Sequence, residues 1–112
     1  MRSLLVQIMT LALTIWEKQL ARSKIELAEQ SGLWRLQLDK DTYRTRTLDK
    51  YLNLATLPAN PRWNNVTKTA HFVLKQQDCQ DTLQTKRLIR TLIQFESLLV
   101  SDVRHGGERA TA

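Results

Sequence analysis

Ser23-Lys24-Ile25-Glu26-Leu27-Ala28-Glu29-Gln30-Ser31-Gly32 is the stretch of sequence on which the predicted fold depends. Ser23 and Glu26 form the S-x-x-E pattern of a capping box, in which each side chain accepts a hydrogen bond from the other residue's backbone N–H. Gly32 follows the last apolar position and favours the left-handed conformation with which many helices end. The stretch therefore predicts a helix of about two turns that closes at a glycine and is followed by a sharp turn.

Upstream of this stretch, residues 3–20 have the apolar periodicity of a helix with an unusually wide apolar face. The face consists of two neighbouring stripes, Val6, Met9, Leu13, Trp16 and Leu20 in one and Leu5, Ile8, Ala12 and Ile15 in the other. Such a width indicates either a large core or a core together with a partner. Because no Gly or Pro interrupts the chain before Ser23, one continuous helix over 3–31 is the alternative to two helices.

Downstream, residues 33–40 are expected to form the second helix of a helix-turn-helix, with Leu33 and Leu36 facing inward. Polar residues at 39–42 predict a turn or loop. Further helices are expected over 47–55, with Thr47 as N-cap, over 61–76, with Asn60 and Pro61 at its start, and from Asp81 to Val103. Residues 104–112 have little to pack and are expected to be a flexible tail.

Two segments carry a resemblance to a known family. Leu27-Ala28-Glu29-Gln30-Ser31-Gly32-Leu33 resembles the core of the phage-repressor-like (Cro/C1, Xre-type) helix-turn-helix family, and Thr45-Arg46-Thr47-Leu48-Asp49-Lys50-Tyr51-Leu52 is similar to its fourth helix. The match covers about residues 11–57. It implies an all-α fold of five to six helices, with a lambda-repressor-like helix-turn-helix at about 23–40 and a C-terminal helical extension over 61–103. The size of the chain fits one helical domain over 1–103.

The composition favours a soluble protein with an anionic partner. Apolar residues make up 42% and charged residues 25% of the 112 residues, as in globular proteins. Seventeen Lys and Arg against eleven Asp and Glu give a net charge of +6, which favours nucleic acid. The apolar run near the N-terminus is too short to span a bilayer, and a single cysteine, Cys79, excludes an internal disulfide. We expect a cytoplasmic protein that does not associate with membranes.

The resemblance also implies which side chains contact DNA. Those expected to reach base edges or phosphates are Arg35, Gln37 and Lys40, and those expected to contact the DNA backbone are Lys24, Gln30, Arg44, Arg46 and Lys50. For Arg44, Arg46 and Lys50 the ordinary alternative is a solvated charged face.

Catalysis finds no support in the sequence. His71, His105 and Cys79 have no partners at the spacing of a catalytic or metal motif, and no Gly-rich phosphate-binding loop is present. We therefore expect no enzyme, no metal site and no cofactor.

The predicted function is a DNA-binding transcriptional regulator of the helix-turn-helix type, with double-stranded DNA as its partner. We expect it to be a homodimer whose two copies join through their N- and C-terminal helices. The alternative is a non-enzymatic helical module for protein–protein interaction or dimerisation that uses the fold as a scaffold. Trp34 and Leu36 keep this alternative open, because they stand where the family has small polar residues. Trp34 is either a core residue or an anchor for a protein partner.

Overall fold

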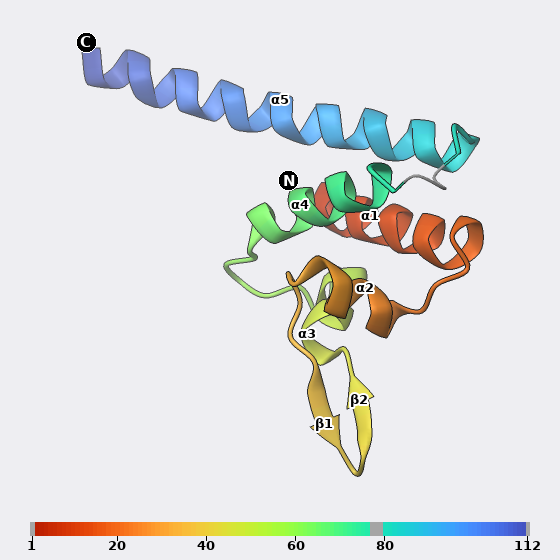
Figure 1. Cartoon of the computed structure of the whole chain (residues 1–112). Coiled ribbons are helices and arrows are strands. Elements are labelled where there is room, and N and C mark those ends of the chain that lie inside the picture. Colours follow the sequence, from red (N-terminus) through yellow and green to blue (C-terminus); the bar gives the residue numbers. More distant parts are fainter. Residues whose placement is uncertain (1, 77–79, 112) are drawn as a thin grey trace.

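The computed structural model describes residues 2–76 and 80–111, with side chains described as far as Val100; Cys79 lies outside the described residues. The described chain is mostly helical and contains one small antiparallel β-hairpin (Figure 1). Its elements are α1 (Arg2–Thr14), continued by the π-helical turn η1 (Ile15–Gln19), α2 (Lys24–Ser31), β1 (Gln37–Asp39), β2 (Thr42–Arg44), α3 (Arg46–Asp49), continued by the 3-10 turn η2 (Lys50–Leu52), α4 (Trp63–Leu74) and α5 (Leu83–Thr111).

Helix α1 is the centre of the core. It packs against α4, α5 and η2, and Figure 1 shows α5 along one side of the molecule and the hairpin projecting from the opposite side. The buried residues of α1 are Leu5, Ile8, Met9, Ala12 and Leu13. The chain's own core therefore uses the wide apolar face of the first helix.

The chain breaks between η1 and α2, so that the segment 3–31 forms two helices rather than one. Ala21 adopts a positive φ of 52°, and the indole Nε1–H of Trp16 donates to the backbone oxygen of Ser23 at 2.7 Å. The guanidinium of Arg22 lies 5.0 Å from the centre of the Trp16 ring. The buried tryptophan thus fixes the position at which the second helix starts.

The predicted capping box and glycine terminus of α2 are both confirmed. The backbone N–H of Glu26 donates to Ser23 Oγ at 3.2 Å, and the N–H of Ser23 donates to Glu26 Oε1 at 3.4 Å. Gly32 ends the helix in the left-handed conformation with φ of 67°.

The second helix predicted over 33–40 is wrong, and the described fold is therefore not all-α. Residues 33–36 have no regular structure, and β1 pairs with β2 in the register Gln37–Arg44, Leu38–Tyr43 and Asp39–Thr42. The predicted turn at 39–42 is present, with Lys40 and Asp41 at its centre. Thr42 and Tyr43 have high β-propensity, and a two-residue turn between short strands favours a hairpin over a helix.

Two helix starts also differ from the prediction. The helix expected over 47–55 is the shorter pair α3–η2, whose N-cap is Thr45 rather than Thr47. Helix α4 begins at Trp63, because Arg62 before it has the non-helical backbone angles φ −80° and ψ 79°. The backbone N–H of Arg62 donates to the hydroxyl of Tyr51 at 2.8 Å. Trp63, the first residue of α4, is 42% exposed.

Helix α5 buries one face against the core through Leu88, Leu92 and Phe95. Large apolar side chains remain exposed on it, namely Leu83, Ile89, Ile93, Leu98 and Val100. The helix continues to Thr111, and the mobility expected for residues 104–112 stays a prediction. In the part of the chain that the structure describes, no helix has the length and apolar character needed to cross a bilayer.

Candidate nucleic-acid interface

A hollow with a volume of about 540 Å³ lies between the turn after α2, the α3–η2 segment and the loop before α4. Three cations line it, Arg35, Lys50 and Arg62, together with the side-chain amides of Asn60 and Asn65. None of the described residues that line it is acidic. We call this surface the basic hollow.

Aromatic residues beneath the basic hollow hold its walls together. The indole of Trp34 is 5% exposed and donates to Thr69 Oγ1 of α4 at 2.8 Å. It packs edge-on against Tyr51 with ring centres 4.8 Å apart. Because the Tyr51 hydroxyl accepts the N–H of Arg62, and Asn65 Nδ2 donates to the carbonyl of Leu33 at 3.2 Å, the three segments that carry the cations have fixed relative positions.

The three cations of the basic hollow have no carboxylate partner among the described residues. All three side chains belong to exposed residues, and none of them forms an ion pair in that part of the structure. Their positive charge is therefore available to an anion from outside, and the neighbouring amides add donors for its oxygens.

A second hollow, of about 320 Å³, has a different electrostatic character. It is lined by Lys24, Arg44 and Arg46, but also by Asp49. Lys24 Nζ lies 2.7 Å from Asp49. Both arginines contact Asp39, which lies outside this lining, at 3.4 Å for Arg44 and 2.8 Å for Arg46. The positive charges of Lys24, Arg44 and Arg46, which were predicted to contact the DNA backbone, are thus partly neutralised by carboxylates of the same chain.

The structure separates the residues predicted to reach DNA into different environments. Arg35 and Lys50 come together in the basic hollow, Lys40 is at the tip of the hairpin, and Gln30 is exposed on the last turn of α2. The amide of Gln37 is already engaged, because its Oε1 accepts the N–H of Arg46 and its Nε2 donates to Thr47 Oγ1, both at 3.0 Å. Gln37 thus positions α3, and half of the hydrogen-bonding capacity of its amide is used within the chain.

Of the two alternatives left open for Trp34, core residue or anchor for a protein partner, the structure shows the first. Trp34 is a core residue, and Leu36 is half-buried against the same core. Sequence analysis did not select Arg62, whose only signal was an outward cation in the first turn of the helix predicted over 61–76. Its relation to Arg35 and Lys50 depends on the distant contact with Tyr51.

The fold and the basic hollow together define a small helical domain with a projecting β-hairpin and an anion-accepting surface. No protein-family model and no curated protein matches the chain, so no match supports membership of the phage-repressor family.

One solved structure is closely similar, the crystal structure of the DNA-binding domain from the sensor histidine kinase ChiS of Vibrio cholerae. The two chains are 41% identical, with a TM-score of 0.83 over 88% of this chain and 92% of that domain. The chain belongs to the same family as that domain.

Proposed function

We propose that this protein binds double-stranded DNA and that the basic hollow holds the DNA backbone. The observation that carries this proposal is the 41% identity, over nearly the whole chain, to a domain described as DNA-binding. The acid-free lining of the basic hollow supports it independently, since unpaired cations and amide donors are the groups that contact phosphates.

In this proposal Arg35, Lys50 and Arg62 each contact a phosphate. Their electrostatic contribution is independent of base sequence and falls as salt rises, because binding releases condensed counterions. Arg44 and Arg46 contribute less, since Asp39 contacts both.

We propose further that the protein regulates transcription, and that it reads bases with an element other than the helix-turn-helix predicted from the sequence. A helix-turn-helix of the expected kind joins its two helices by a short turn, whereas here the hairpin lies between α2 and α3. The base-reading element we propose is therefore not a helix over 33–40. Arg35 and Lys40 remain candidates for contacts with DNA, whereas the amide of Gln37 is partly engaged in positioning α3.

A salt titration tests the proposal. Binding of a fluorescent duplex is measured by anisotropy at several salt concentrations for the wild type and for Arg35→Ala, Lys50→Ala and Arg62→Ala. We expect each variant to bind more weakly, and we expect the slope of log affinity against log salt to fall by about 1 for each phosphate that the variant cannot neutralise.

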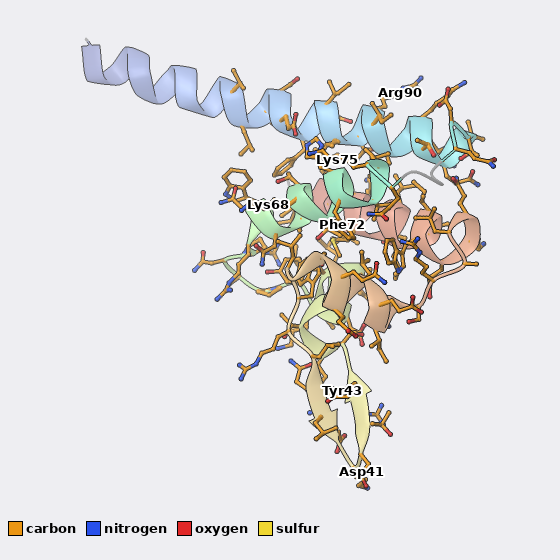
Figure 2. All side chains as sticks on the ribbon, in the orientation of Figure 1. Asp41, Tyr43, Lys68, Phe72, Lys75 and Arg90 are labelled. Atoms are coloured by element: carbon orange, nitrogen blue, oxygen red, sulfur yellow. The ribbon has the colours of Figure 1, made fainter. Side chains whose placement is uncertain are left out.

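Arg90→Ala is the matched control for this titration. Arg90 is an exposed cation on α5, and Figure 2 shows it on the side of the molecule opposite the hairpin. Its removal changes the net charge equally, so we expect a smaller effect on the slope. If all four variants behave alike, the basic hollow is not the binding surface. If the wild type binds no duplex at low salt, the DNA-binding proposal itself fails.

The homodimer predicted from the sequence stays a prediction. Helix α1 uses its apolar face inside the core, so α5 is the terminal helix with exposed large apolar residues in the described structure. Sedimentation equilibrium of the wild type and of Ile93→Glu measures whether this face joins two copies.

A further inference from the structure

The hairpin exposes an apolar pair that the proposed phosphate contacts do not use. Leu38 of β1 and Tyr43 of β2 are direct cross-strand partners, and they are 65% and 55% exposed. Figure 2 shows Tyr43 on the projecting arm and Asp41 at its tip, away from the body of the domain. Tyr43 also lines the second hollow beside Ile25, but neither side chain packs against the described core, and more than half of each faces solvent.

The opposite face of the hairpin is already occupied. Successive side chains of a strand alternate between its faces, so Gln37 and Asp39 lie on the face away from Leu38. Gln37 bonds to the start of α3, and Asp39 contacts Arg46 at 2.8 Å. The hairpin is thus fastened to α3 by its polar face, and the face with Leu38 and Tyr43 is the one left free.

Charge and dimensions indicate a partner for this free face. Residues 35–50 contain five Lys and Arg against three Asp, so the surroundings of the hairpin are positive. Two paired strands are about 4.8 Å apart, and a two-stranded ribbon fits the major groove of about 12 Å but not, face-on, the minor groove of about 6 Å. An apolar face in the major groove meets one apolar group of the bases, the C5-methyl of thymine.

We infer that the hairpin lies face-on in the major groove and that Leu38 and Tyr43 contact thymine methyl groups there. This inference rests on the proposed DNA binding and adds to it the source of sequence preference. The basic hollow then holds the backbone, while the apolar pair selects sites rich in thymine at the contacted positions.

The experiment removes only the methyl group. Duplexes are first selected from a random library by the wild-type protein, and the enriched duplex is then prepared with thymine or with uracil, which lacks the C5-methyl. We expect the wild type to bind the uracil duplex about fourfold more weakly for each thymine methyl group that the hairpin covers. We expect the double variant Leu38→Thr/Tyr43→Thr to lose most of this preference, because one small methyl group on each side chain covers much less of a thymine methyl than Leu or Tyr does.

The double variant is chosen to keep the hairpin, because Thr has high β-propensity and Thr pairs are favourable across strands. Circular dichroism and a thermal melt check its fold. Thr42→Ser, a change of an exposed residue on the opposite face, is the matched control and is expected to keep the wild-type preference for thymine.

Three outcomes overturn the inference while leaving DNA binding intact: no sequence is enriched, the wild type binds both duplexes equally, or the double variant keeps the preference. In each case the apolar pair is free for another role, such as contact with a protein. Absence of binding to any duplex is a different result, since it removes the proposed function rather than the assignment of the hairpin.

Discussion

At the scale of single residues, two side chains and one glycine fix the geometry around the basic hollow. Trp34 ties the segment after α2 to α4 through Thr69, and Tyr51 ties α3–η2 to the loop before α4 through Arg62. Gly32 provides the positive φ that turns the chain from α2 toward Trp34. Replacing any one of these three residues is expected to move the cations relative to each other without changing their number.

Gly32→Ala is expected to destabilise the protein by about 1 kcal/mol, because a Cβ is unfavourable at φ of 67°. Among the described residues, no atom outside Gly32 and its two chain neighbours lies within 4 Å of the position the Cβ would take, so the cost comes from the backbone alone. Chemical denaturation measures it. Gly32→Asn is the matched comparison, since Asn tolerates the left-handed region better and is expected to lose less stability. Equal losses for Ala and Asn would show that backbone conformation is not the cause.

At the scale of secondary-structure elements, the hairpin is stable only through its connection to α3. Its strands have three residues each, and an isolated hairpin of this size is marginally stable in water. The bonds from Gln37 to Arg46 and Thr47 and the ion pairs of Asp39 supply the connection. Gln37 and Arg46, which the sequence presented as candidates for DNA contact, therefore hold the hairpin in place.

The turn of the hairpin is a place where stability is expected to rise. Lys40 and Asp41 both have positive φ, 50° and 64°, as a type I′ turn requires, and Asn-Gly is the preferred pair for that turn. Lys40→Asn/Asp41→Gly is expected to stabilise the hairpin by about 1 kcal/mol, measured by a thermal melt and by amide hydrogen exchange of β1 and β2. Slower exchange confined to the hairpin supports the argument, and unchanged or faster exchange contradicts it.

At the scale of the whole molecule, α1 joins two halves with different surfaces. On one side α5 packs against α1. Its residues Ile89, Ile93 and Val100 remain exposed on the outer surface. On the other side lie α2, α3 and the hairpin (Figure 1), and α3–η2 and the turn after α2 contribute to the basic hollow. DNA bound at the basic hollow and a partner bound at α5 would therefore occupy opposite sides of the molecule.

A pair of substitutions on α5 tests how the halves depend on each other. Phe95 is fully buried with its ring centre 6.2 Å from that of Trp63, and Phe95→Ala is expected to cost about 3–5 kcal/mol of the free energy of unfolding. Ile93→Ala, two residues away and 58% exposed, is expected to change it by no more than about 0.5 kcal/mol. A single denaturation transition for both variants fits one cooperative domain. If α5 alone unfolds in the Phe95→Ala variant while DNA binding is kept, the chain contains two units that unfold independently.

The amino-acid sequence by itself determined the local features of this protein. The capping box, the glycine terminus, the break before Ser23 and the turn at 39–42 follow from contacts between residues a few positions apart, and these contacts are the same in many folds. The apolar periodicity of the first helix likewise indicated which of its faces the core buries.

Only the tertiary structure decided what residues 33–44 and Arg62 do. The spacing of Leu33 and Leu36 suggested a helix, whereas hydrogen bonds and an ion pair from Gln37 and Asp39 to α3 hold this segment as a hairpin. The basic hollow was equally inaccessible from local pattern, because Arg35, Lys50 and Arg62 are far apart along the chain. Long-range burial of Trp34 and Tyr51 brings them together, and a contact of that kind leaves no signature in the spacing of residues.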